Sequence, residues 1–394
     1  MTPRERILAA INRRPTDCIP CCPDFSNMIP CRLTDRPFWD MYLFNDPPMW
    51  QVYIDCAKYF NVDAMMDCHM DVLTEIDGKL YGGFGEYFPE TKQAIIRRDP
   101  DRIYTQYYMD KDDGSRQWFD ACSVYYIDNP PNMWVPLAQF NFPDIPESYE
   151  DVTPKEEPKG EELLKMAKEY MGDQGIVGTY CGVGSLVGNE EQLYDYLDNP
   201  EKYTDLRDRL IAIYKKRFDV LMSWDTKPDF IATGSSGTLV FQTVDMFKEL
   251  GLPIIKNTAA MCKQAGIPSH VHSCGPETAV IELCATQTDL SFIDPLELPP
   301  MGDCDLARMK EQFGDKIVLK GNLHTTNVML FGTVDDVEKA ARQAIDDAGE
   351  GGGFILSTGD QCGRDTPDEN IFKMIEVART YGQYDENMTL IKDQ

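Results

Sequence analysis

The feature that most constrains the fold is a regular alternation of helical and strand-like segments after Glu161. Apolar residues recur three or four positions apart in each helical segment, and a short apolar run follows each one. This alternation predicts a parallel sheet with helical crossovers. The expected strands are Gly175–Val183, Asp229–Thr233, Ile267–Ser273, Leu290–Ile293, Lys316–Leu323 and Gly353–Ser357. The expected helices include Val244–Gln264, interrupted at Pro253, and Leu306–Phe313 and Val334–Ala348.

Two earlier apolar runs, Cys18–Phe25 and Val62–Met66, bring the expected strands to eight. Eight such units predict an α/β fold, a (β/α)8 TIM barrel that forms one domain over residues 1–394. A doubly wound open sheet is the alternative. No G-x-G-x-x-G loop follows a strand, so a dinucleotide site is not predicted.

The N-terminal third has a different pattern of residues. Between residues 80 and 134, aromatic and β-branched residues alternate with charged ones, and Asp113-Gly114 marks a turn. We predict that this stretch is an antiparallel β-meander inserted after the second barrel strand. Residues 143–160 are rich in Pro, Glu and Asp, and we expect an acidic linker there.

The charge balance limits the partners of the chain. Its 66 acidic and 38 basic residues give a net charge of −28, which disfavours nucleic acid and anionic lipid as partners. We find neither an apolar run long enough to span a membrane nor the apolar core of a signal peptide. We therefore expect a cytoplasmic protein whose 13 cysteines are free thiols or metal ligands.

A local concentration of histidine and cysteine is the first sign of chemistry. The chain has only 4 histidines, and two of them lie in the run His270-Val271-His272-Ser273-Cys274. Side chains two positions apart on a strand point the same way, so His272 and Cys274 share a face. They lie at the C-terminal end of a strand, where TIM barrels place their active sites. His270 lies one step deeper and is the second choice as a ligand. His69 is expected at the surface or in a turn.

An imidazole and a thiolate on one face form half of a tetrahedral zinc site. Cys362, in the loop after the last strand, is the best candidate for a third ligand. Three protein ligands would leave the fourth position open, as catalytic zinc requires. The structural alternative is a neutral core histidine with two buried free cysteines, since free cysteine packs as a small hydrophobe.

Other polar residues follow neighbouring strands at the same end. Asp294 follows the sixth strand, where it either orients a ligand histidine or caps a turn. Asn322 and His324 end the seventh strand, where they either line the pocket and bind a cofactor or cap a loop. Asp360 precedes Cys362 by two residues and, like Asp294, either orients a ligand histidine or caps a turn.

Four runs of the chain resemble the uroporphyrinogen decarboxylase superfamily. They are Thr2-Pro3-Arg4-Glu5-Arg6-Ile7-Leu8-Ala9-Ala10 with Asp17-Cys18-Ile19-Pro20, Val271-His272-Ser273-Cys274-Gly275, Lys320-Gly321-Asn322-Leu323-His324 followed by Leu330-Phe331-Gly332-Thr333, and Cys362-Gly363 before Thr366-Pro367. The chain looks like the corrinoid-dependent methyltransferase branch, which includes methylcobamide:coenzyme M methyltransferases. That branch carries a His-x-Cys…Cys zinc site, which matches His272, Cys274 and Cys362. The resemblance also implies a (β/α)8 barrel.

The resemblance implies zinc as the cofactor and a methylcorrinoid as co-substrate. Asp-x-His-x-x-Gly, which is typical of corrinoid carriers, does not occur in the chain, so the corrinoid is expected on a partner carrier protein. The methyl group would pass to a thiol or another small acceptor such as tetrahydrofolate, or travel in the reverse direction. Metal-free decarboxylation of a tetrapyrrole is the alternative function. The Arg-rich motif that the resemblance would lead one to expect in a decarboxylase is absent from the chain, since Ile19 to Thr34 contains only Arg32. A non-catalytic protein that binds zinc or corrinoid is a third hypothesis.

Overall fold

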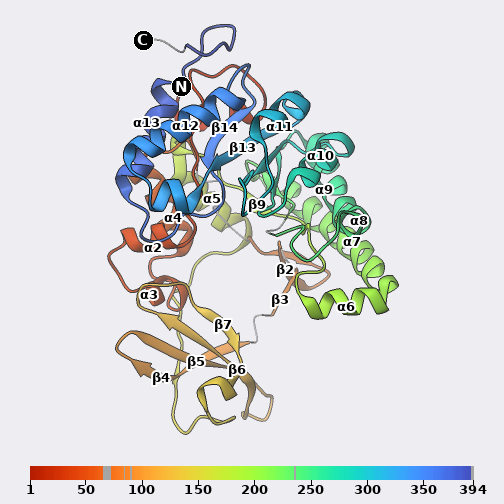
Figure 1. Cartoon of the computed structure of the whole chain (residues 1–394). Helices are drawn as coiled ribbons and strands as arrows, with labels where there is room; N and C mark the ends of the chain where they lie inside the picture. The colour runs from red at the N-terminus through yellow and green to blue at the C-terminus, as the bar shows by residue number, and fades with distance from the viewer. Residues whose placement is uncertain (65–71, 84, 89–90, 235–236, 392–394) are drawn as a thin grey trace.

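The computed structural model describes residues 1–64, 72–83, 85–88, 91–234 and 237–391. Its C-terminal part is built on a six-stranded parallel sheet in the order β14-β13-β12-β11-β10-β9 (Figure 1). Successive strands are joined by helices, which confirms the predicted parallel sheet with helical crossovers. The strands are β9 (Thr179–Tyr180), β10 (Ile231–Ala232), β11 (Ser269–His272), β12 (Phe292–Asp294), β13 (Val318–Leu323) and β14 (Phe354–Thr358).

The helices of this part lie around the parallel strands (Figure 1). They bury apolar faces of the kind that the 3.6-residue period predicts. They are α5 (Gly160–Met171), α6 (Glu190–Asp198), α7 (Pro200–Ser223), α8 (Val244–Glu249), α9 (Gly251–Ala265), α10 (Thr278–Gln287), α11 (Leu306–Phe313), α12 (Val334–Ala348) and α13 (Asp368–Thr380). The predicted bounds of α11 and α12 agree with the structure.

The predicted interruption of a helix at Pro253 is wrong by three residues. The break falls at Leu250, between α8 and α9. Pro253 lies in the first turn of α9, where a missing N–H leaves no hydrogen bond unmade within the helix.

The first two expected strands are less regular than the other six. Cys21 forms a single parallel bridge to Leu356 of β14. Its carbonyl accepts from Asp63 N at 3.0 Å, which links the segment 18–25 to the segment that follows. Residues 62–64 form no strand, and residues 65–66 of the expected strand, like His69, lie outside the described residues.

Four helices lie in the first 60 residues: α1 (Pro3–Ile11), α2 (Met28–Leu33), α3 (Phe38–Tyr42) and α4 (Met49–Phe60). Thr2 caps α1 by accepting from Glu5 N. Arg4 of α1 pairs with Asp229 at 2.6 Å and donates to the Gly175 carbonyl at 2.9 Å. These bonds fasten α1 to the segments that lead into β9 and β10.

The predicted antiparallel meander forms two separate sheets. A three-stranded sheet has the order β1-β2-β3 and a five-stranded sheet the order β7-β6-β5-β4-β8. Figure 1 shows the five-stranded sheet at the end of the molecule opposite to both chain termini. The strands are β1 (Thr74–Ile76), β2 (Lys79–Gly82), β3 (Gly85–Tyr87), β4 (Lys92–Asp99), β5 (Arg102–Asp110), β6 (Arg116–Tyr126), β7 (Asn132–Val135) and β8 (Glu150–Asp151). Antiparallel pairing thus extends beyond residues 80–134, and β8 lies within the expected linker.

A buried arginine fastens the three-stranded sheet to the rest of the chain. Arg217 of α7 is 0% exposed and donates to the carbonyls of Val72 at 2.8 Å and Tyr81 at 2.6 Å. It also donates to Thr74 Oγ1 at 2.9 Å and to the Tyr180 carbonyl at 3.1 Å. One side chain therefore holds β1, β2 and β9 together.

The twelve cysteines within the described residues are free thiols. None of the helices in that part of the chain combines the length and low polarity that crossing a membrane requires.

Candidate metal centre

His272 and Asp294 are cross-strand partners at the ends of β11 and β12. Because the strands are parallel and in register, their side chains emerge at the same edge of the sheet. Asp294 Oδ1 lies 2.9 Å from His272 Nδ1. A carboxylate at Nδ1 fixes the ring with the proton on that nitrogen, so Nε2 is left to act as a ligand.

Asp294 is the centre of a buried polar network. The same oxygen lies 3.0 Å from His270 Nε2, and Lys320 of β13 donates to the other oxygen. The side chains of Asp294 and Lys320 are each 1% exposed. Burial opposes the charge of Asp294, but Lys320 and the two histidines hold the pKa of its carboxyl well below the usual value.

The same network acts on His272. Burial disfavours the imidazolium, but the adjacent Asp294 carboxylate raises the pKa of His272 well above its ordinary value. His270 lies deeper, where its ring stacks on Phe292 with centroids 4.4 Å apart. The structure thus holds His270 within the core and His272 toward the end of the strand, as their order along the strand predicts.

Three potential ligand atoms converge beyond His272. One atom each from His272, Cys274 and Asp360 lie within 4.8 Å of one another. Cys274 follows β11 and Asp360 follows β14. Gly275, with φ +88°, turns the chain away directly after Cys274. Nitrogen, sulfur and oxygen donors in one small group suit zinc, and the surrounding carboxylates favour a dication.

Cys362 lies in the same loop as Asp360 but outside that group of ligand atoms. Its backbone N–H donates to the Asp24 carbonyl at 2.9 Å, and its carbonyl accepts from Ser26 Oγ at 3.1 Å. The thiol is 0% exposed, and burial raises its pKa to about 12. The structure therefore brings His272 and Cys274 together, whereas Cys362 lies two residues beyond Asp360 and is bonded to the end of the first expected strand and to Ser26 after it.

Asn322, in β13, and His324, directly after it, both form hydrogen bonds to the backbone of loops. The Asn322 amide donates to the Leu296 carbonyl at 3.1 Å. His324 Nδ1 accepts from Thr326 N and Asn327 N, each at 3.2 Å, at the start of the short helix η3 (Thr325–Leu330). These contacts are those of the loop-capping alternative, and a role as pocket wall remains a proposal.

Three charged residues of the site were not predicted from the sequence. Lys320 interrupts an apolar buried strand, a signal that could have indicated it. Glu297 accepts from Gly275 N, directly after Cys274. Glu277 is 0% exposed and accepts from Leu296 N at 2.8 Å, and burial raises the pKa of its carboxyl well above the ordinary value. Their positions depend on contacts between different strands and loops, which a single sequence does not reveal.

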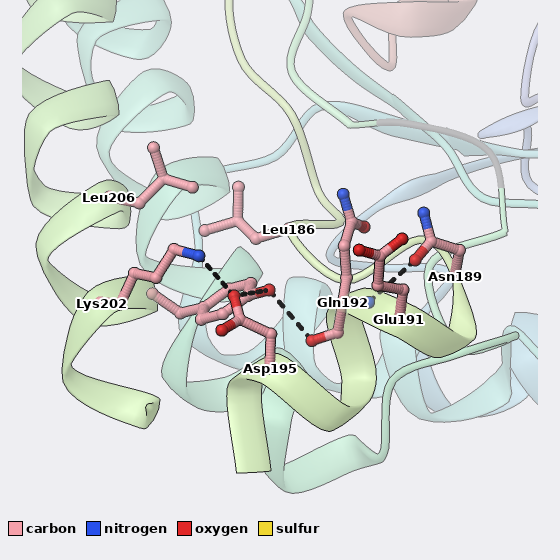
Figure 2. A pocket seen from close by; sticks show the side chains of 8 residues that line it. Leu186, Asn189, Glu191, Gln192, Asp195, Lys202 and Leu206 are labelled. Atoms are coloured by element: carbon pink, nitrogen blue, oxygen red, sulfur yellow. Dashed lines mark hydrogen bonds and ion pairs between the residues drawn. The ribbon is translucent and has the colours of Figure 1, made fainter. Parts of the chain in front are cut away.

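A separate cavity of about 540 Å³ lies between α6 and α7 (Figure 2). Its polar wall is paired internally: Asp195 accepts from Lys202 at 2.5 Å and from the Tyr203 hydroxyl at 3.1 Å. Leu186 and Leu206 form the apolar side. With its central carboxylate already paired, this cavity is a weaker candidate site than the strand ends.

Comparison with known proteins agrees with the motifs. Residues 191–381 match the model of the uroporphyrinogen decarboxylase (URO-D) family. Just under half of the chain therefore resembles this family. The matched segment carries the His272–Cys274 run, Asp294, Lys320 and Cys362. The superfamily resemblance inferred from the sequence is thereby confirmed.

Two individual proteins are similar to this chain. A methylcobamide:CoM methyltransferase, MtbA, from Methanosarcina mazei is 26% identical over 137 residues, which cover 35% of this chain and 37% of that protein. The match thus spans little more than a third of the curated relative. A solved structure described as a methyltransferase from Methanosarcina mazei covers 96% of this chain and 98% of its own, with a TM-score of 0.58 and 16% identity. The latter likeness concerns the fold.

Proposed function

We propose that the protein is a zinc-dependent methyltransferase that moves a methyl group between a corrinoid on a partner protein and a thiol or other small acceptor. His272, Cys274 and Cys362 are the proposed metal ligands. The observation that carries the proposal is the convergence of His272, Cys274 and Asp360 donor atoms within 4.8 Å at the ends of two parallel strands. The similarity to a methylcobamide:CoM methyltransferase supports the choice of reaction.

We also propose that the parallel sheet closes into the predicted (β/α)8 barrel. The segment 18–25 bonds to β14, and Asp63 bonds to Cys21. One buried cluster supports closure because it joins Cys22 and Ala64 to residues from β9, β10, β12, β13 and β14, with α1 side chains packed against them. Such a cluster is expected of an interior shared by all barrel walls.

The residues around the site have distinct proposed tasks. Asp294 holds the His272 ring so that Nε2 faces Cys274 and Asp360, and Lys320 balances the Asp294 charge. Glu297 fixes the backbone after Cys274. Zinc held here would lower the pKa of a bound thiol so that a thiolate forms near neutral pH. Asn322 and His324 are proposed as pocket walls next to this position.

A corrinoid carried by another protein requires an accessible surface near the site. The loops that follow the strands at this end expose large apolar side chains. Phe331 after β13 is 76% exposed, Met301 after β12 is 63% exposed and Val240 after β10 is 56% exposed. Exposed apolar residues of this kind are typical of contact surfaces and support docking of a carrier here.

Metal-free tetrapyrrole decarboxylation receives less support. A polycarboxylate substrate requires cationic side chains, yet Asp360 and Glu297 lie close to the candidate centre. Arg32, the single arginine between Ile19 and Thr34, is already paired with Asp368. The neighbourhood therefore suits a cation better than a carboxylate.

The test measures methyl transfer from methylcobalamin to a panel of thiols. The absorbance of the demethylated corrinoid reports the transfer. Zinc-loaded wild type should transfer the methyl group, and Cys274→Ser should lose at least about tenfold in rate because a zinc ligand is removed. Cys122→Ser, in the five-stranded sheet, is the matched control. Zinc-loaded protein that transfers to no thiol or tetrahydrofolate, in either direction, would contradict the proposal.

A further inference from the structure

We propose that the carboxylate of Asp360 is itself a ligand of the metal and fills the position beside His272 and the two cysteines until an incoming substrate displaces it. The inference rests on the proposed zinc site and names a residue that the His-x-Cys…Cys pattern does not include. It begins from the three donor atoms that the structure groups within 4.8 Å: those of His272, Cys274 and Asp360.

The spacing between His272 and Asp360 fits two ligands of one ion. His272 Nε2 lies 3.6 Å from Asp360 Oδ1. A charge-assisted hydrogen bond would be about 2.7–2.9 Å. Two ligands bound at about 2.0–2.3 Å to a tetrahedral zinc ion lie roughly 3.3–3.7 Å apart. The observed separation is therefore too long for a direct ion-pair hydrogen bond and suits a shared metal.

The orientation of the His272 ring points to the same assignment. Its Nδ1 is occupied by Asp294 at 2.9 Å, so Nε2 is the nitrogen that can ligate. Asp360 faces that nitrogen. Asp294 already orients the ring through Nδ1. A second carboxylate beside Nε2, the ligating nitrogen, is therefore not needed to orient the ring.

The backbone presents Asp360 in an unusual conformation. Asp360 has φ +101°, which side-chain-bearing residues rarely adopt, and Gly359 N donates to the Leu323 carbonyl at 2.7 Å just before it. The Asp360 side chain is 29% exposed, whereas Cys362 is fully buried. The loop thus holds the carboxylate on the accessible side of the site, where an incoming substrate arrives.

The experiment compares Asp360→Asn and Asp360→Ala with wild type, and uses Asp365→Asn in the same exposed loop as the matched control. Zinc affinity is measured against a competing chelator. Cobalt(II) is then substituted, because its visible absorption bands report the number and kind of ligand atoms. Thermal unfolding of each variant checks that it folds.

If Asp360 is a ligand, both Asp360 variants should bind zinc at least about tenfold more weakly and shift the cobalt bands, while Asp365→Asn matches wild type. Unchanged affinity and bands would overturn the inference. Weaker binding with unchanged bands would also overturn it, because Asp360 would then act without touching the metal.

His272→Ala distinguishes failure of this inference from failure of the site. If His272→Ala takes up zinc and cobalt as wild type does, the metal is not at this centre, and the proposed function and the Asp360 assignment both fall. If His272→Ala loses the metal but the Asp360 variants retain it with unchanged bands, only the Asp360 assignment falls.

Discussion

Asp294 and His272 occupy paired positions on adjacent parallel strands, with carboxylate oxygen and Nδ1 2.9 Å apart. The register of β11 and β12 therefore sets the orientation of the histidine before any ligand binds. A site prepared in this way loses little conformational freedom when it takes up a metal.

Asp294→Asn should weaken zinc binding about 10- to 100-fold, because an amide orients the imidazole poorly and does not raise its basicity. The measurement is chelator competition. Asp289→Asn is the matched control, since Asp289 lies just before β12 and pairs with the exposed Lys263. Equal losses in both variants would show that the effect is not specific to the histidine contact.

Zinc affinity should fall with decreasing pH from a point well above pH 6.5. The reason is that Asp294 raises the pKa of His272 in the metal-free protein, and the imidazole must lose its proton to bind zinc. In the metal-free protein, the stability gained from the charged His272 is complete below pH 6.5 and is lost as pH rises through its raised pKa. Histidine NMR titration of the metal-free protein tests the shift directly. A midpoint at or below 6.5 would contradict it.

Lys320→Met should lower the free energy of unfolding by about 3–5 kcal/mol, because it leaves Asp294 as a buried charge without its main cationic partner. Denaturant unfolding of wild type, Lys320→Met and the exposed control Lys339→Met measures the loss. A loss below about 1 kcal/mol, the range of surface ion pairs, would argue against the buried pair.

Arg217→Met should release the three-stranded sheet, since the Val72 carbonyl loses its guanidinium donor and the Tyr81 carbonyl keeps only the Thr74 hydroxyl as a side-chain donor. Each buried group left unpaired costs about 1–3 kcal/mol. Hydrogen exchange should accelerate in residues 74–82 more than in β11 to β14. The exposed Arg209→Gln on the same helix should leave exchange unchanged, and uniform acceleration would mean global destabilisation instead.

The periodicity of the sequence was sufficient to predict the parallel sheet and several helix bounds, because amphipathic helices such as α11 and α12 repeat their apolar positions clearly. It did not reveal α2 and α3, which span six and five residues and are too short to show a period. The sequence also led us to expect a helix break at Pro253, which the first turn of α9 accommodates.

The candidate site was predictable where residues share one strand or loop. Strand parity placed His272 and Cys274 together, and the position of Asp294 after a strand suggested its contact with a histidine. Lys320, Glu297 and the proximity of Asp360 to His272 depend on how different strands and loops meet, which only the folded structure shows.

The central claim is a zinc ion held by His272, Cys274 and Cys362. The most direct test is the zinc content of purified wild type, Cys362→Ser and the control Cys122→Ser, measured by atomic emission after dialysis. We predict stoichiometric zinc in wild type and Cys122→Ser, and its loss in Cys362→Ser. Absence of zinc from zinc-supplied wild type, or full retention in Cys362→Ser, would contradict the account.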